Sequence, residues 1–177
     1  MYSPPVEAME RVLDKGKLHE LCRQVGIGAP RSWFPRGPED LPAIGREAGY
    51  PLLVKVREGF GSRHIYRAES AEEVAHHLAR TPVESFVQEL CLGEEISIDV
   101  LCDLDGRCLN AIPRTMIQSK GGESIKGRSF RDPELIAHGA WVAETIGVVG
   151  PANVQCFREP DGTLPVTDVN LRFGGGF

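Results

Sequence analysis

The alternation of residue types between Glu95 and Cys102 places the strongest constraint on how this chain folds. Isoleucine or valine alternates there with serine, aspartate and leucine, and a period of two is typical of a half-buried β-strand. The turn-forming segment Asp103–Gly106 follows, and Cys108–Ile117 can return as the hairpin partner. We therefore expect antiparallel sheet in this part of the chain.

A second hairpin is predicted near the end, within Gln155–Gly176, because two apolar runs flank the turn Glu159–Thr163. On its second strand Asp168, Asn170 and Arg172 stand two positions apart, so their side chains should leave one face. A carboxylate, an amide and a guanidinium could form an oxygen-rich Mg²⁺ site beside an anion clamp. An ordinary exposed polar face explains the same spacing.

The remaining elements follow from capping and turn signals. Helices are expected from Asp14 to Gly26, from Pro38 to Ala48, from Ser70 to Ala79 and from Asp132 to Gly147. Short strands are expected at Pro51–Val56, Ile65–Arg67 and Val87–Leu90, and the polar segment Gln118–Arg131 should be a mobile loop. This order predicts an α+β fold with mostly antiparallel sheets, in two lobes covering residues 1–88 and 89–177.

Composition excludes several classes of protein. The net charge is −5 and the basic residues are dispersed, so a nucleic acid is not the expected partner. No apolar run is long enough to span a membrane, and the chain does not begin with a basic segment followed by an apolar one, so we do not expect a secreted protein. Five scattered cysteines without CxxC spacing favour a reducing compartment, so we expect a cytoplasmic protein.

Two lysines and a glycine loop are candidates for binding phosphate. Lys15 lies in a helical first turn, where the helix dipole disfavours a cation, and Lys55 lies in an apolar strand. Each is either an ordinary solvated lysine or an anion ligand. The loop Gly59–Ser62 could bring backbone N–H groups close to phosphate, but it matches neither the dinucleotide-binding nor the Walker A pattern.

These pieces, in this order, resemble the ATP-grasp superfamily, in particular the ATP-grasp domain of the carbamoyl-phosphate synthase large subunit and related carboxylate–amine ligases. The matching segments cover nearly the whole chain. They are Asp14-Lys15 with Gly26-Ile27 and Pro30, then Tyr50–Lys55, Gly59–Ser62, Val87–Glu89, Gly93–Val100, Gly150–Gln155 and Asp168–Phe173.

The resemblance implies a role for each matching residue. The phosphates would be contacted by Lys15, Lys55 and the loop residues Gly59, Gly61 and Ser62. The adenine would be recognised by Glu89, Leu90 and Cys91, and the ribose would be bound by Glu95. A further nucleotide contact would come from Ser119 and Lys120. The metal ligands would be Gln155, Asp168 and Asn170, and Arg172 with Lys55 would stabilise the transferring phosphate.

The implied activity is an ADP-forming ligase that uses ATP with Mg²⁺, or Mn²⁺ in its place, to convert a carboxylate into an acyl-phosphate for attack by an amine or thiol. Arg114 and Lys126 are candidates for contacting the acceptor. The family's usual glutamate is Asp168 here, and Leu171 replaces its usual proline. Because the family normally has further chain at both ends, we expect a fragment that needs a partner, a second copy or a longer chain. The alternative is a nucleotide-binding or assembly module without turnover.

Overall fold

The computed structural model describes residues 6–59, 64–81, 83–120 and 123–174, which form two compact units. The discontinuous unit combines Met1–Ala29 with Leu92–Phe177, and the inserted unit is Pro30–Cys91. From the sequence we expected one division, near residue 88, with the helix at Asp14–Gly26 in the first lobe. In the structure this helix and the one before it contact the last strand and therefore belong with the C-terminal half of the chain.

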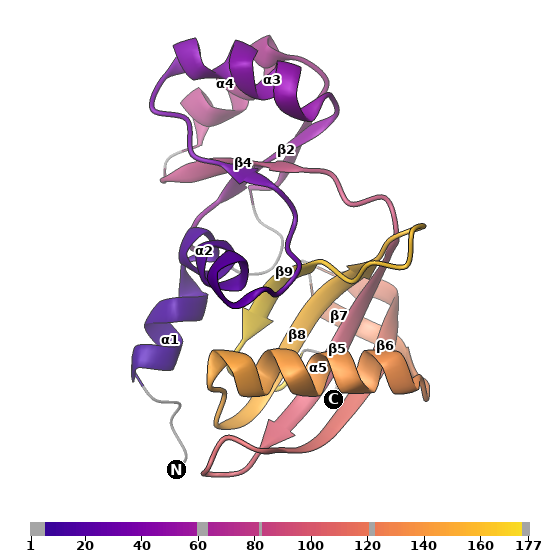
Figure 1. The fold of residues 1–177 in the computed structure, drawn as a ribbon. Coiled ribbons are helices and arrows are strands. Elements are labelled where there is room, and N and C mark those ends of the chain that lie inside the picture. Colours follow the sequence, from indigo (N-terminus) through magenta and orange to yellow (C-terminus); the bar gives the residue numbers. More distant parts are fainter. Residues whose placement is uncertain (1–5, 60–63, 82, 121–122, 175–177) are drawn as a thin grey trace. The chain divides into compact units, whose positions relative to one another are not determined.

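The inserted unit is a four-stranded antiparallel sheet with two helices (Figure 1). Its strand order is β1 (Ser32–Trp33), β4 (Ser85–Glu89), β2 (Leu52–Val56) and β3 (Tyr66–Ala68). The short 3₁₀ helix η1 (Pro38–Asp40) leads into α3 (Leu41–Ala48), and α4 (Ala71–Arg80) follows β3. Leucine and valine from β2 and β4 pack against α3 and α4 to form the core of this unit.

Two signals in the sequence correctly located the helices of the inserted unit. Ser70 accepts a hydrogen bond from the backbone N–H of Glu73, so it is the N-cap of α4 as predicted. The predicted helix at Pro38–Ala48 is present as η1 and α3. Strand β1 was not predicted, because two residues are too few to show a periodicity.

The discontinuous unit contains a five-stranded antiparallel sheet in the order β7-β6-β5-β8-β9 (Figure 1). The strands are β5 (Glu94–Cys102), β6 (Cys108–Lys120), β7 (Glu123–Ser129), β8 (Gly150–Arg158) and β9 (Val166–Asn170). Helix α5 (Pro133–Ile146) crosses one face, and α1 (Val6–Leu13) and α2 (Lys15–Val25) contact β9.

The fit between α5 and the sheet shows which face is the core. A Cβ atom on Gly139 would lie 2.5 Å from Cγ2 of Ile98, so the helix backbone approaches the sheet closely at this glycine. The buried residues Ile96, Ile98 and Val100 therefore face α5, and the polar residues between them face the opposite side.

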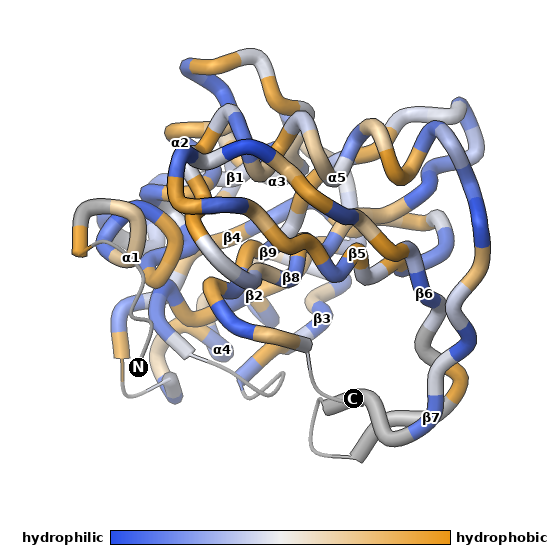
Figure 2. The backbone as a smooth tube through the Cα atoms, turned by 90° about the horizontal axis from the view of Figure 1, so that it is seen from below, coloured by the Kyte–Doolittle hydropathy of each residue, from blue (hydrophilic) through white to orange (hydrophobic). Residues whose placement is uncertain are grey.

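The prediction of a mobile loop at Gln118–Arg131 is wrong. Strand β6 continues to Lys120, and β7 pairs with it in antiparallel register, including Arg114 with Ser129 and Thr115 with Arg128. Figure 2 shows many hydrophilic positions along this hairpin. Because the hairpin is polar, contains glycine and has two irregular register steps, its sequence lacks the alternation that marks a strand.

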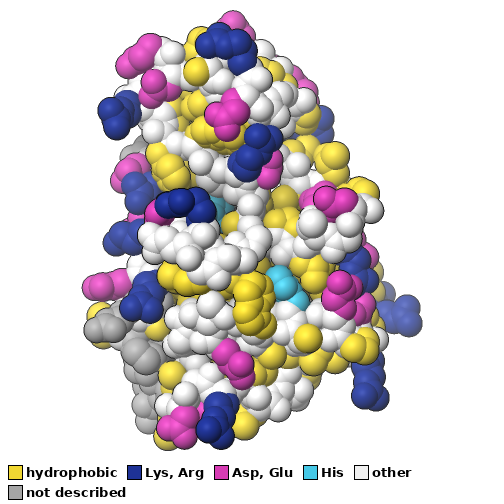
Figure 3. All heavy atoms as spheres, in the orientation of Figure 1, with side chains coloured by type: hydrophobic (Ala, Val, Ile, Leu, Met, Phe, Trp, Pro, Cys, Tyr) yellow, Lys and Arg dark blue, Asp and Glu magenta, His cyan; other side chains and the backbone are white. Residues whose placement is uncertain are grey.

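Edge strand β9 is in contact with the segment that follows α2 and with both N-terminal helices. The backbone N–H of Val166 donates to the carbonyl of Gly28, 2.8 Å away, and helices α1 and α2 contact the strand. The described helices do not include one that is long and apolar enough to cross a bilayer. On the face seen in Figure 3, acidic side chains are interspersed with the basic ones.

Candidate functional site

The polar face of the five-stranded sheet carries the three residues predicted to bind a metal. Gln155 on β8 is the register partner of Asp168 on β9, and Asn153 is the partner of Asn170. Ser97 on β5 pairs with Gln155 in the same row. Since side chains in one row leave the same face, Gln155, Asp168 and Asn170 share the face opposite α5.

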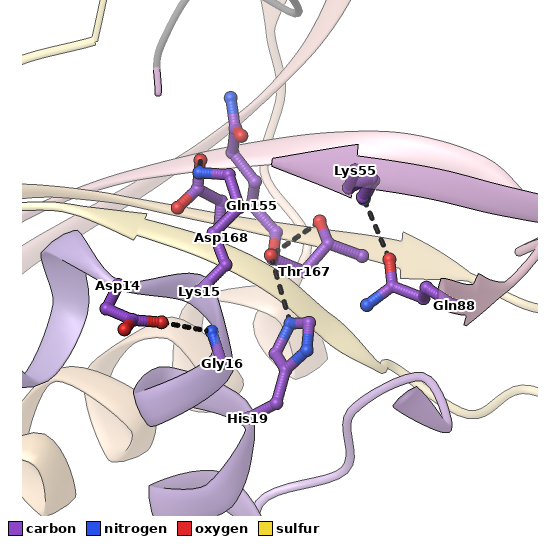
Figure 4. Close-up of polar contacts among 9 residues, drawn as sticks. All are labelled: Asp14, Lys15, Gly16, His19, Lys55, Gln88, Gln155, Thr167 and Asp168. Carbon is purple, nitrogen blue, oxygen red and sulfur yellow. Dashed lines mark hydrogen bonds and ion pairs between the residues drawn. The ribbon is translucent and has the colours of Figure 1, made fainter. Parts of the chain in front are cut away.

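The best-defined polar contact on this face is the ion pair between Lys15 and Asp168. Their Nζ and Oδ2 atoms are 2.9 Å apart, and the two side chains are only 14% and 19% exposed. Figure 4 shows the carboxylate of Asp168 beside the ammonium group of Lys15, with Gln155 on the same side of the sheet. Lys15 is therefore not an ordinary solvated lysine.

The first turn of α2 is held in place by capping and by one histidine. Asp14 accepts hydrogen bonds from the backbone N–H groups of Gly16 and Lys17, at 2.8 and 3.2 Å. Nε2 of His19 lies 3.3 Å from the carbonyl of Thr167 (Figure 4). Because a carbonyl only accepts, Nε2 carries the proton. These contacts place the helix N-terminus, with its positive dipole end, next to β9.

A second ion pair on the same face was not identified as a unit from the sequence. Nε of Arg114 lies 2.6 Å from Oδ2 of Asp99, and the amide of Asn153 lies 2.8 Å from Oδ1. Arg114 was considered only as an acceptor contact, and Asp99 only as part of the β5 alternation. The polar positions of that alternation were the available signal, but the register that joins them spans three strands.

Arg172 lies beyond the end of β9. Its backbone N–H donates to the carbonyl of Asn170 at 2.8 Å, and its Nη1 donates to the carbonyl of Phe173 at 3.0 Å. The chain bends here, so the strand alternation that we extended to residue 172 stops at Asn170. The Arg172 side chain is exposed.

In the inserted unit, Lys55 lies on the central strand β2 and donates to Oε1 of Gln88 at 2.7 Å. The amide of Gln88 donates in turn to the hydroxyl of Ser32 at 3.0 Å, and that hydroxyl donates to the carbonyl of Pro30. These contacts define the orientation of the Gln88 amide. Figure 4 shows the first of them, between Lys55 and Gln88. Lys55 is thus held by a buried partner, rather than standing on an edge strand.

The residues predicted to bind the base and the ribose are divided between the two units of the chain. Glu89 binds the backbone N–H and the Nε of Arg31, both at 2.8 Å. Leu90 and Cys91 are half-buried after β4, and Glu95 is half-buried on β5 in the discontinuous unit. The carboxylate of Glu89 is therefore already engaged by a neighbouring arginine.

The other predicted phosphate and nucleotide contacts lie partly outside the described residues. Gly59 is exposed after β2, whereas Gly61 and Ser62 are outside the described ranges. Ser119 and Lys120 belong to the backbone of β6, paired with Ser124 and Glu123, and their side chains are outside the description.

Burial keeps three of the cysteines in the thiol form. It raises the pKa of Cys22 and of Cys102 to about 11, and that of Cys156 to about 12. A thiolate is the nucleophilic form of cysteine, so these side chains are not poised for nucleophilic attack at neutral pH. Among the described residues there is also no group of three or more His, Cys, Asp or Glu side chains placed to hold a metal.

Comparison with known proteins agrees with this architecture. Residues 81–177 match the family described as "ATP-grasp in the biosynthetic pathway with Ter operon". The carbamoyl phosphate synthase large chain of Pyrococcus furiosus is 27% identical over 172 residues, which is 89% of this chain and 16% of that protein. The corresponding protein of Hyperthermus butylicus is 29% identical, with 88% and 16% covered. The chain thus spans about a sixth of the length of these relatives.

Solved structures show the same fold. Biotin carboxylase from Campylobacter jejuni superimposes with a TM-score of 0.81 at 19% identity, covering 96% of this chain and 42% of that chain. D-alanine–D-alanine ligase from Coxiella burnetii superimposes with a TM-score of 0.75 at 18% identity, covering 96% and 50%. With the match over residues 81–177, the chain belongs to the ATP-grasp family and is similar to carboxylate–amine ligases.

Proposed function

We propose that this chain binds ATP with Mg²⁺ and forms the nucleotide-binding part of an ADP-forming ligase. The observation that carries the proposal is the Lys15–Asp168 ion pair beside Gln155 and Asn170 on one sheet face. The relatives with which it shares most of its length are carbamoyl phosphate synthases, and one matching structure is of a biotin carboxylase complexed with β,γ-ATP.

The oxygen donors on this face suit Mg²⁺ held jointly with a phosphate. Mg²⁺ is commonly bound through one or two carboxylates together with waters and substrate phosphates. Asp168 offers the carboxylate, and the side-chain amides of Gln155 and Asn170 offer neutral oxygens in the neighbouring positions. When bound, the metal would offset negative charge on the phosphoryl group being transferred.

Lys15 has two tasks in this scheme. Its ammonium group neutralises Asp168 at 2.9 Å. Asp168 would also hold the metal, and Lys15, at the positive end of α2, would bind the phosphate oxygens. The lysine is therefore held by a carboxylate in a position where it can bind an anion.

The chemistry that we propose needs charge neutralisation and no side-chain nucleophile. Phosphorylation of a carboxylate by ATP gives an acyl-phosphate, which an amine or a thiol attacks. The roles of Lys55 and Arg172 are to neutralise the transferring phosphoryl group. The raised pKa values of the buried cysteines fit a reaction without a thiolate nucleophile.

One observation favours the alternative, a nucleotide-binding module without turnover. Asp168 is one methylene shorter than glutamate, and Oδ2 is already bound to Lys15. Both hypotheses predict heat of binding when MgATP is titrated into the protein. The two hypotheses predict different results when ADP release is measured with panels of carboxylates and amines. ADP release that depends on an added carboxylate supports the ligase, whereas nucleotide binding without any substrate-dependent ADP supports the module.

A further inference from the structure

The ion pair between Asp99 and Arg114 is buried on the same sheet face as the proposed metal ligands. The two side chains are 6% and 12% exposed, and Asn153 is 2% exposed. Both carboxylate oxygens are engaged, since Oδ2 accepts from Arg114 at 2.6 Å and Oδ1 accepts from Asn153 at 2.8 Å. We call Asp99, Arg114 and Asn153 the buried triad.

A buried triad of this kind is not explained by stability alone. Removing two charges from water costs free energy that their attraction often only just offsets, so apolar residues would hold the sheet together as well. The strands that carry the triad, β5, β6 and β8, do have apolar residues in the core on their other face, toward α5. The charges on the polar face therefore suggest a requirement for geometry.

The segment that follows β9 rests on the buried triad. Gly174 is buried, and a Cβ atom there would lie 2.2 Å from Nη2 of Arg114. The same atom would lie 2.7 Å from Oδ1 of Asp99 and 3.0 Å from Nδ2 of Asn153. All three members of the triad thus meet the backbone at one glycine, and only a residue without a side chain fits that approach.

Arg172 lies between two residues, Asn170 and Gly174, that are both next to the buried triad. On one side Asn170 is the register partner of Asn153. On the other side Gly174 packs on the triad. Between them the chain makes a tight bend, in which the N–H of Arg172 donates to the carbonyl of Asn170 at 2.8 Å. Fixing both ends of so short a bend restricts where the Arg172 side chain can reach.

We propose that the buried triad seats the segment from Leu171 to Gly174 and thereby positions Arg172, with Arg114 as a positioning residue. This inference rests on the proposed function, in which Arg172 contacts the terminal phosphate of ATP. Arg114 acts on that phosphate only through Arg172. It follows that Arg114 affects the affinity for ATP and not the affinity for ADP, because ADP lacks the terminal phosphate.

The test measures affinities for MgATP and MgADP by calorimetry in Arg114→Gln, Arg172→Gln and the double variant. Arg128→Gln is the matched control, since Arg128 is exposed on β7, adjacent to the strand that carries Arg114. We expect Arg114→Gln to lower the affinity for MgATP about tenfold, because the charge-assisted contact between Arg172 and the terminal phosphate is lost. The affinity for MgADP should stay within about twofold of the wild-type value. The double variant should be no weaker than Arg172→Gln alone.

Two results overturn the inference: equal weakening of MgATP and MgADP in Arg114→Gln, or additive effects of Arg114→Gln and Arg172→Gln. Gly174→Ala provides a second variant, which keeps all three residues of the buried triad and should reproduce the selective loss of MgATP affinity. If it binds MgATP as the wild type does, the inference is wrong.

Hydrogen exchange separates this inference from the proposed function. The backbone amides from Arg172 to Gly174 should exchange faster in Arg114→Gln and Gly174→Ala than in the wild type or Arg128→Gln. Absence of nucleotide binding in the wild type would contradict the proposed function alone. Unchanged exchange in both variants would contradict the seating of the segment, whatever the nucleotide results.

Discussion

The ammonium group of Lys15 lies 2.9 Å from Oδ2 of Asp168, although 153 positions separate the two residues in the sequence. A lysine in the first turn of a helix is disfavoured by the helix dipole. The carboxylate of Asp168 offsets that cost, and the contact joins the start of α2 to β9. One pair of residues therefore links the N-terminal helices to the strand that carries the proposed metal ligands.

Replacing Lys15 with methionine should lower the free energy of unfolding by about 1–2 kcal/mol, because Asp168 is left partly buried without its partner. Asp168→Asn should cost less, and the two changes should not be additive. Urea denaturation of the single and double variants measures this coupling. Lys17→Met is the control, since Lys17 is exposed on the same helix. Additive effects would show that the pair does not stabilise the fold.

Gly139→Ala should destabilise the protein by about 1–3 kcal/mol, because the new Cβ would lie 2.5 Å from Cγ2 of Ile98 in a packed core. Helix propensity alone predicts the opposite sign, with alanine more stable than glycine by about 1 kcal/mol. Thermal or urea denaturation therefore decides between the two effects, through the sign of the change in the free energy of unfolding. A stabilised variant would show that α5 does not pack on β5 at this position.

Stability should fall as the pH decreases below about 6.5 because of His138. Burial lowers the pKa of His138 in the folded protein, against the opposing effects of Glu134 and the Leu164 carbonyl, and Nε2 has no hydrogen-bond partner among the described residues. The unfolded chain then binds more protons than the folded one in the window just below the ordinary pKa, so acid favours unfolding.

Comparison of denaturation curves between pH 7 and pH 5 checks this prediction about His138. His138→Leu should lose less stability over that range than the wild type does. His64→Gln serves as the control, because His64 is exposed. An equal slope in His138→Leu and the wild type would contradict the assignment.

Asp132→Ala should destabilise α5 by about 1–2 kcal/mol, since Asp132 is the N-cap of this helix. It accepts from the N–H groups of Glu134 and Leu135 at 3.0 and 3.2 Å, and Nη2 of Arg158 lies 2.6 Å away. Asp132→Asn should retain most of the capping effect. Thermal denaturation of both variants measures the difference, and equal losses would assign the effect to the ion pair with Arg158.

Local signals in the sequence were enough to locate most of the helices and strands. Asp14 and Gly26 bound α2 as capping rules predict, and Gly26 adopts the left-handed backbone conformation with a φ of 77°. The alternation in Glu95–Cys102 correctly indicated a strand, which is β5 in the structure. Helix α1 (Val6–Leu13) was not predicted.

The candidate site was only partly predictable, because its contacts depend on pairing between distant strands. Alternation alone placed Asp168 and Asn170 on one face. It could not show that Lys15 pairs with Asp168, or that Arg114 pairs with Asp99 on the neighbouring strand. The strand register and the helix position determine these contacts, and neither is encoded in a local pattern. The same limitation explains why the end of β6 and the whole of β7 were predicted as a loop.

The measurement that tests the central claim most directly is calorimetric titration of the wild type, Lys15→Met and Lys17→Met with MgATP. We expect the wild type and Lys17→Met to bind with similar affinity. Lys15→Met should bind at least about tenfold more weakly, because a phosphate loses a cation at a helix N-terminus. No heat of binding in the wild type, or equal affinities in all three proteins, would contradict the assignment of this sheet face as an MgATP site.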